Sequence, residues 1–365
     1  MGLSVGIVGL PNVGKSTLFN ALTAKKVAAE NYPFCTIDPA VGVVAVPDER
    51  LESLAKLSNS VKTIPAVVEF VDIAGLVEGA SRGEGLGNQF LAHIREVDAL
   101  FHVIRCFQDD NVAHVTGELD PVRDLKTVEN ELILADLETV EKRYAKTQPM
   151  LKTGREEYKA ELKILEHLRE ALSEGQAVRE LKLKEDERIL TDQLFLLTDK
   201  PVLYAANVDE DHFAGGSKKD LRYRSLEEYL NKGELVALAG QLEAEVAEFS
   251  PGERLPFLQE AGIEETGLVR LVRASFNLLD LIIFYTAVGP ELRAWTLAEG
   301  SPAPAAAGKV HSDMERGFIK AEVINYNELI MQGSLKTARR EGLVRTEGRD
   351  YIIKDGDICE FKFNV

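Results

Sequence analysis

Residues 9–17 read GLPNVGKST and fit the pattern G-x-x-x-x-G-K-[ST]. Glycines at these positions allow main-chain N–H groups to surround phosphate oxygens. We expect the Lys15 ammonium to contact the β- and γ-phosphates as a binding and catalytic group, and the Ser16 hydroxyl to bind Mg²⁺. The predicted nucleotide-binding residues of this loop are Asn12, Val13, Gly14, Lys15, Ser16 and Thr17.

Residues 67–75 read VVEFVDIAG and supply an acid at the end of a neighbouring predicted strand. We expect Asp72 to hold the metal through water, and the Gly75 amide to face the γ-phosphate as a catalytic group. Thr36, in NYPFCTI at 31–37, is expected to ligate Mg²⁺ in the triphosphate state and to release it after hydrolysis. The alternative is that Thr36 is an ordinary surface-loop residue.

Residues 205–210 read AANVDE and are expected to select the base. Guanine-specific proteins of this class carry N-K-x-D at such a strand end, whereas here Val208 replaces the Lys and Glu210 replaces the Asp. A carboxylate one methylene longer cannot keep the same bidentate geometry, so discrimination for guanine falls. We therefore expect ATP to bind at least as readily as GTP, and to be preferred. The predicted base-pocket residues are Asn207, Val208, Glu210, Ala239, Gly240 and Gln241.

Leu76 stands directly after D-x-x-G, where water-orienting GTPases have Gln. A Leu side chain cannot orient water, so hydrolysis is expected to be slow unless another group acts. His114, in a predicted loop after the strand that ends near Arg105, is the candidate to position or deprotonate the water. The alternative is an exposed loop His with no catalytic role.

These residues require a sheet that brings the ends of several strands together. Short apolar runs predict buried strands, and the polar, helix-compatible segments between them, such as 17–24, predict an α/β wound sheet. The predicted strands are 4–8, 41–46, 66–71, 99–105, 201–206 and 235–239.

The interval 124–198 has no strand pattern. Two apolar stripes of helical period lie in it, separated by a break near Pro149 and Gly154. They predict two antiparallel helices of about 20–23 residues each, an inserted helical hairpin. The stripes consist of Leu125, Val128, Leu132, Ala135 and Val140, and of Leu162, Leu165, Leu168 and Leu172.

The tail begins near residue 281 and is predicted to contain a loose stretch at 300–308 and strands at 318–324, 351–353 and 359–365. It also carries the densest basic cluster of the chain. This cluster has two interpretations, a contact for rRNA or tRNA phosphates and a solvated helix face. Its members are Lys336, Arg339, Arg340, Arg345 and Arg349.

The chain has 365 residues and a net charge of −17, and most of the excess acid lies outside the hairpin and the tail. This balance argues against wholesale coating of nucleic acid. The three cysteines are far apart and give neither a disulfide framework nor a zinc pattern, which favours a reducing compartment. No apolar run is long enough for a membrane span and the N-terminus lacks a signal-peptide pattern. We expect a cytoplasmic protein without a membrane partner, and favour a monomer.

With these motifs assembled, the chain resembles the YchF-type, Obg-like ATPases, a family of translation-factor-related P-loop proteins. The resemblance covers the whole chain and implies a P-loop NTPase domain (1–124 plus 199–280), a coiled-coil insert (125–198) and a C-terminal TGS domain with a β-grasp fold (281–365). In that family N-x-x-E goes with ATP, and ribosomes are the partner. The motifs are GLPNVGKST at 9–17, NYPFCTI at 31–37, DIAGLV at 72–77, NVDE at 207–210, RAWT at 293–296, AGKVHSDMERGFIKA at 307–321 and KDGDI at 354–358.

The Asn12 position resembles potassium-activated members of the wider class, which implies K⁺ as a further cofactor beside Mg²⁺. The alternative is that Asn12 caps the loop. Three functions remain open on the sequence: an ATPase switch whose nucleotide state sets ribosome affinity, a GTPase, and an RNA-binding adaptor with a structural nucleotide.

Overall fold

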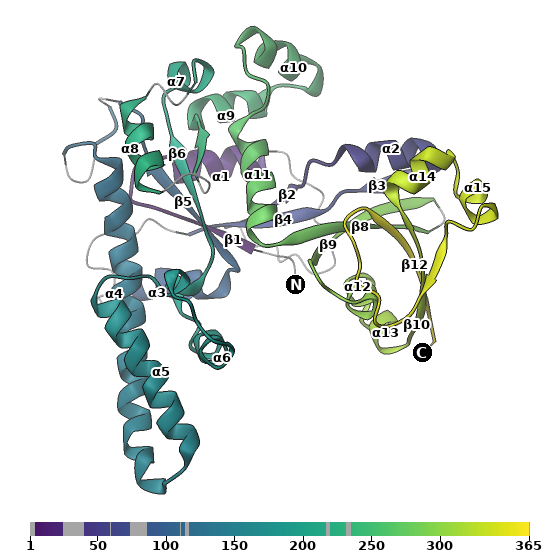
Figure 1. Cartoon of the computed structure of the whole chain (residues 1–365). Helices are drawn as coiled ribbons and strands as arrows, with labels where there is room; N and C mark the ends of the chain where they lie inside the picture. Colours follow the sequence, from purple (N-terminus) through teal and green to yellow (C-terminus); the bar gives the residue numbers. More distant parts are fainter. Residues whose placement is uncertain are drawn as a thin grey trace.

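The computed structural model describes residues 4–24, 40–58, 60–73, 86–109, 111–113, 117–216, 220–230, 235–288 and 290–364. Two six-stranded sheets organise these residues, and a long helical hairpin projects from the first sheet (Figure 1). None of the described helices combines the length and the apolar character that a membrane span requires.

The first sheet has the strand order β2-β4-β1-β5-β6-β7. β2 is antiparallel to β4, and the other neighbours are parallel. The central strands β5 and β6 are fully buried, which explains why they are apolar on both faces. The predicted α/β wound sheet is confirmed, and each predicted strand lies within one or two residues of an observed one. The bounds are β1 Ser4–Val8, β2 Val41–Ala45, β4 Val67–Asp72, β5 Ala99–Arg105, β6 Val202–Asn207 and β7 Leu235–Leu238.

Helices pack against this sheet and cover its buried strands (Figure 1). Three of them begin with a side-chain cap, from Asp220 in α8, Ser250 in α10 and Thr266 in α11. Thr266, for example, accepts a hydrogen bond from Val269 N. The bounds are α1 Lys15–Thr23, α3 Leu86–Glu96, α7 Glu210–Ala214, α8 Leu221–Tyr229, α9 Gly240–Glu248, α10 Pro251–Glu260 and α11 Gly267–Leu278.

The hairpin consists of α4 (Pro121–Thr147) and α5 (Glu156–Ser173), joined by a 3₁₀ turn over Gln148–Thr153. Both predicted apolar stripes are buried. The predicted length of 20–23 residues is wrong for both helices, since α4 has 27 residues and α5 has 18. Asp120 caps α4 by accepting from Arg123 N, so this helix begins before the expected boundary at 125. α6 (Glu185–Leu194) returns the chain to the sheet.

The second sheet has the order β11-β10-β12-β8-β9-β3 and packs against α12 and α13, as in a β-grasp fold. The stretch 300–308 is not loose: Ala303, Ala306 and Ala307 are buried on one side of α12, because small side chains let the helix approach the sheet. The bounds are β3 Lys62–Ile64, β8 Leu281–Val288, β9 Glu291–Ala298, α12 Ala303–Val310, α13 Ser312–Arg316, β10 Phe318–Asn325, α14 Tyr326–Gln332, α15 Leu335–Arg340, β11 Arg345–Glu347 and β12 Asp357–Phe363.

The strand predicted at 351–353 is wrong. Ile352 forms only an isolated bridge with Pro302, and the chain turns soon afterwards to enter β12. The predicted strands at 318–324 and 359–365 correspond to β10 and β12.

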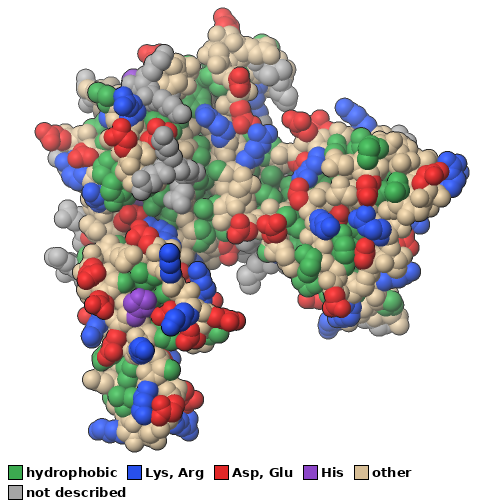
Figure 2. Space-filling model, viewed as in Figure 1, with side chains coloured by type: hydrophobic (Ala, Val, Ile, Leu, Met, Phe, Trp, Pro, Cys, Tyr) green, Lys and Arg blue, Asp and Glu red, His purple; other side chains and the backbone are tan. Residues whose placement is uncertain are grey.

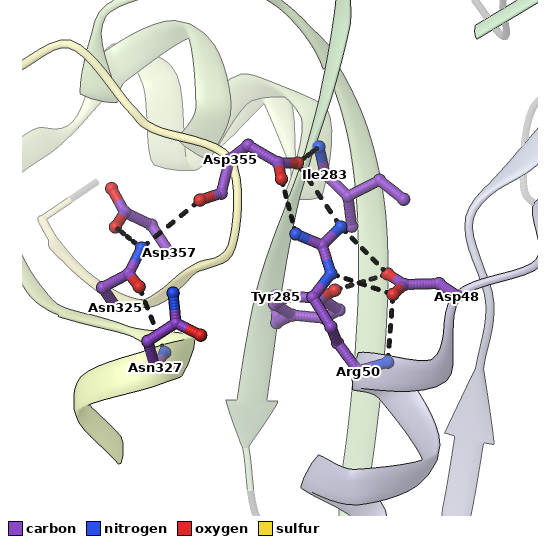
Figure 3. Close-up of polar contacts among 8 residues, drawn as sticks. All are labelled: Asp48, Arg50, Ile283, Tyr285, Asn325, Asn327, Asp355 and Asp357. Carbon is purple, nitrogen blue, oxygen red and sulfur yellow. Dashed lines mark hydrogen bonds and ion pairs between the residues drawn. The ribbon is translucent and has the colours of Figure 1, made fainter. Parts of the chain in front are cut away.

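The segment between β2 and β4 joins the two sheets. It forms α2 (Glu49–Ser58) and then β3, which pairs in parallel with β9. At the start of α2, Arg50 lies between Asp48 and Asp355, and Tyr285 donates a hydrogen bond to Asp48 (Figure 3). β3 lies in the predicted NTPase domain but adds a strand to the sheet of the predicted tail domain, which begins at 281. The division into three domains therefore stays a prediction.

Candidate functional site

The phosphate-binding loop runs from the end of β1 to the start of α1. Gly9 and Gly14 have φ values of 150° and 100°, which L side chains rarely adopt. A Cβ atom on Gly9 would lie 2.5 Å from the Val103 carbonyl oxygen, and one on Gly14 would collide with Asn207 Nδ2. Both glycines are therefore required by backbone conformation and by close approach.

Lys15 is buried inside this loop. Its Nζ donates to the carbonyl oxygens of Leu10 (2.7 Å) and Gly9 (3.1 Å). Burial lowers the pKa of Lys15 to about 8, while the Asp72 carboxylate acts in the opposite direction. The ammonium is thus held among main-chain carbonyls of the loop that follows β1.

Asp72 is the last residue of β4 and pairs in register with Ile7 of β1, which places it beside the phosphate-binding loop. Its main-chain N–H donates at 2.9 Å to the carbonyl oxygen of Ala40, the residue before β2. Burial raises the pKa of Asp72, and Lys15 opposes that shift. Ser16 is exposed in the first turn of α1. The predicted residues Thr36 and Gly75 lie outside the described residues, as does Leu76.

Asn207 connects the predicted base pocket to the phosphate-binding loop. Its Nδ2 donates to Val13 O (3.0 Å) and its Oδ1 accepts from Gly240 N (2.8 Å). Both distances are within the range of well-formed hydrogen bonds. The segments predicted at 12–17, 207–210 and 239–241 therefore lie together, as the sequence predicted.

A cavity of about 950 Å³ opens at this junction, at the carboxyl ends of β5, β6 and β7. This edge is where ligands bind in open α/β sheets. Eight residues that the sequence analysis assigned to nucleotide binding line the cavity: Gly14, Thr17, Asn207, Val208, Glu210, Ala239, Gly240 and Gln241. The other residues that line it were not assigned to the site from the sequence: Phe107, Gln108, Asp109, Asn111, Val112, Asp209, Asp211, Ala244, Glu245 and Glu248.

Two carboxylates near the predicted base pocket, Asp209 and Glu210, differ in their surroundings. Asp209 accepts from Arg222 Nη2 (3.0 Å) and from Gln108 N (3.2 Å), so protein groups occupy it. Burial raises the pKa of Glu210, and the neighbouring carboxylates of Glu245 and Asp211 add to the shift. Glu210 thus retains a proton more readily than an isolated Glu.

The segment after β5 forms a further wall of the cavity. Asn12 Nδ2 donates to Ala113 O at 3.1 Å, which joins this wall to the phosphate-binding loop. His114 follows directly but lies outside the described residues. The turn-forming run Asp109-Asp110-Asn111 was the only sequence signal for this wall, and it gave no hint of its partners.

In the tail, the basic cluster is largely neutralised by neighbouring acids. Arg339 pairs with Glu322 (2.8 Å) and Glu360 (3.0 Å), and Arg345 pairs with Glu328 (3.2 Å). Figure 2 shows acidic and basic side chains interspersed over this part of the surface. The pattern is that of a mixed polar surface rather than a continuous basic patch.

A glycine-lined loop after the first strand, an acid at the end of the adjacent strand and a cavity at the strand ends define a P-loop nucleotide-binding protein. Comparison with known proteins agrees. A family model described as "50S ribosome-binding GTPase" matches residues 4–165, and the YchF-GTPase_C model, described as "Protein of unknown function (DUF933)", matches residues 281–364.

Full-length relatives narrow this class to one family. The chain is 49% identical to the "Ribosome-binding ATPase YchF" of Bacillus subtilis and 47% identical to that of Escherichia coli O157:H7, covering 100% of each chain. The solved Schizosaccharomyces pombe YchF GTPase superposes with a TM-score of 0.89 at 35% identity, over 99% of this chain and 98% of that one. The chain belongs to the YchF family.

Proposed function

We propose that this protein is a Mg²⁺-dependent ATPase whose nucleotide state controls binding to the ribosome. The observation that carries the proposal is the side chain of Asn207, which joins the phosphate-binding loop to the base pocket within one cavity. A triphosphate at Lys15 and a purine between residues 207–210 and 239–241 would then occupy one continuous site. The names of the bacterial relatives support ATP as substrate and the ribosome as partner.

The carboxylates support ATP over GTP. Guanine recognition requires an ionised carboxylate that accepts from two N–H groups of the base. Asp209 is occupied by Arg222, and the pKa of Glu210 is raised by burial and by Glu245. Neither residue supplies that acceptor well, whereas adenine does not require it.

The residues proposed to hold Mg²⁺ are Ser16, Thr36 and Asp72. They offer hydroxyl and carboxylate oxygens, the donors that Mg²⁺ prefers. Asp72 lies close enough to Lys15 that each affects the pKa of the other, so this carboxylate lies beside the phosphate-binding loop. When bound, the ion neutralises charge on the phosphate oxygens.

Among the chain's own groups, Lys15 would stabilise charge that develops on the γ-phosphate, and the Gly75 amide would donate to the same group. His114 would position the attacking water, because Leu76 cannot. For Asn12 we propose K⁺ as a second cofactor near its Oδ1, since Nδ2 is engaged by Ala113 O. Equal turnover in sodium and potassium buffers would exclude K⁺.

Steady-state ATP hydrolysis with and without purified ribosomes tests the proposal. We expect slow turnover alone, a several-fold increase with ribosomes, and loss of both in Lys15→Ala. An unstimulated basal rate together with tight ribosome binding would instead support an RNA-binding adaptor with a structural nucleotide. We expect the activity in the cytoplasm.

A further inference from the structure

Arg105 is the last residue of β5, at the edge of the sheet that borders the nucleotide cavity. It lies opposite Asn207 in the parallel register of β5 and β6, and only 4% of it is exposed. A buried guanidinium requires hydrogen-bond acceptors to offset the hydration that it has lost. Its acceptors therefore identify what the side chain holds in place.

Three main-chain carbonyls accept hydrogen bonds from Arg105. Nε donates to Phe107 O (3.2 Å), Nη2 to Asp109 O (3.2 Å) and Nη1 to Val112 O (2.9 Å). The guanidinium also lies 4.5 Å from the centroid of the Phe107 ring, in cation–π geometry. One side chain thus holds the main chain at Phe107, Asp109 and Val112.

The described residues of the segment 107–113 contact both halves of the nucleotide site. Ala113 O accepts from Asn12 Nδ2 (3.1 Å) in the phosphate-binding loop. Gln108 N donates to Asp209 Oδ1 (3.2 Å) in the base loop. The same segment supplies five of the residues around the cavity: Phe107, Gln108, Asp109, Asn111 and Val112.

We propose that Arg105 is a positioning residue that fixes residues 107–109 and 111–113 as a wall of the nucleotide site. This inference rests on the proposed function, because the wall acts on whatever nucleotide the cavity holds. An Arg is required because its planar group directs several N–H donors to separate carbonyls at once. The single ammonium of Lys cannot reach all three.

The test uses Arg105→Lys and Arg105→Gln in the full chain, with Lys200→Met as a matched control. Lys200, which is partly buried, likewise donates to main-chain carbonyls, those of Arg95 (3.1 Å) and Val97 (2.5 Å). It lies at the other end of the strands, before the start of β6. Four quantities are measured: amide hydrogen exchange of residues 106–113 without nucleotide, ATP affinity, the split between KM and kcat, and the midpoint of unfolding.

We expect both Arg105 variants to accelerate exchange of 106–113 by about tenfold or more and to weaken ATP binding by about tenfold, with a larger change in KM than in kcat. Lys200→Met should lower the unfolding midpoint without changing ATP affinity. Unchanged exchange in the Arg105 variants overturns the assignment whether or not nucleotide binds. Faster exchange with parental ATP affinity, or an equal loss of affinity in Lys200→Met, overturns it too. Failure of the parent protein to bind ATP contradicts the proposed function instead.

Discussion

The side-chain amide of Asn207 donates to the main-chain carbonyl of Val13 across 194 residues of sequence, at 3.0 Å. Asn207 is buried, and its side-chain oxygen Oδ1 accepts a hydrogen bond from Gly240 N. This residue therefore fixes the distance between the loop that would hold phosphate and the loop that would hold the base. Its substitution should therefore weaken nucleotide binding as well as lower overall stability.

Asn207→Ala leaves the Val13 carbonyl and the Gly240 N–H without their partner, at a cost of about 1–3 kcal/mol for each buried group. We expect ATP affinity to fall by about thirtyfold in an equilibrium titration. Asn325→Ala is the matched control, because Asn325 caps α14 in the tail, where its Oδ1 accepts from Asn327 N (3.1 Å). ATP affinity within twofold of the parent in Asn207→Ala would contradict the role of this residue.

ATP affinity should depend on pH through Lys15. Because burial lowers the pKa of Lys15 to about 8, its ammonium deprotonates above that pH in the free protein, whereas a bound triphosphate favours the charged form. Binding then takes up a proton, and affinity falls by up to about tenfold per pH unit above 8. Titrations at pH 7.5, 8.5 and 9.5 measure this dependence. Lys15→Arg should lose it, and a flat parental profile would be incompatible with the assignment.

The two aspartates that contact Arg50 should contribute unequally to stability (Figure 3). The Asp48 side chain is 7% exposed and also accepts from Tyr285, whereas the Asp355 side chain is 49% exposed. Removing a partner from a buried ion pair costs about 3–5 kcal/mol, and an exposed pair contributes about 0–1 kcal/mol. Urea unfolding should show a larger loss for Asp48→Ala than for Asp355→Ala. The reverse order would refute this interpretation of the contact between the sheets.

Glu243 should make stability decrease as the pH rises. Its carboxylate is 2% exposed and accepts from Gly267 N (2.5 Å), and burial raises its pKa to about 7 against the opposing effect of the backbone N–H donors. The folded protein therefore holds a proton on Glu243 more tightly than the unfolded chain does. The stability that this proton contributes is complete below pH 4.5 and is lost as the pH rises through 7.

Glu243→Gln removes this titration. The variant should exceed the parent by about 2–3 kcal/mol at pH 8 and differ little at pH 4.5, measured by urea unfolding at both values. The exposed Glu260→Gln is the control. Equal effects of Glu243→Gln at the two pH values would exclude Glu243 as the source.

The features that could be predicted from the sequence are those that a local residue pattern determines. Fully buried parallel strands such as β5 and β6 leave continuous apolar runs, and the loop at 9–17 has a spacing that few other structures require. The apolar stripes of α4 and α5 were likewise visible, although the ends of both helices were not.

The missed features depend on distant partners. β3 has three residues, two of them exposed, and exists because it pairs with β9 more than 200 residues later. The sequence predicts a loose stretch where α12 forms, because Pro and Gly stand among its alanines. Only burial against the second sheet reveals the helix. Arg105 carried no signal, since its three acceptors are main-chain carbonyls whose positions follow from the folded loop.

Calorimetric titration of the parent protein with ATP and with GTP, both with Mg²⁺, tests the central claim most directly. We expect one ATP site per chain with a dissociation constant on the order of micromolar, and weaker binding of GTP. No heat of binding from either nucleotide at millimolar concentration, with the protein folded, would contradict the account of the site. Tighter binding of GTP than of ATP would contradict the role assigned to Glu210.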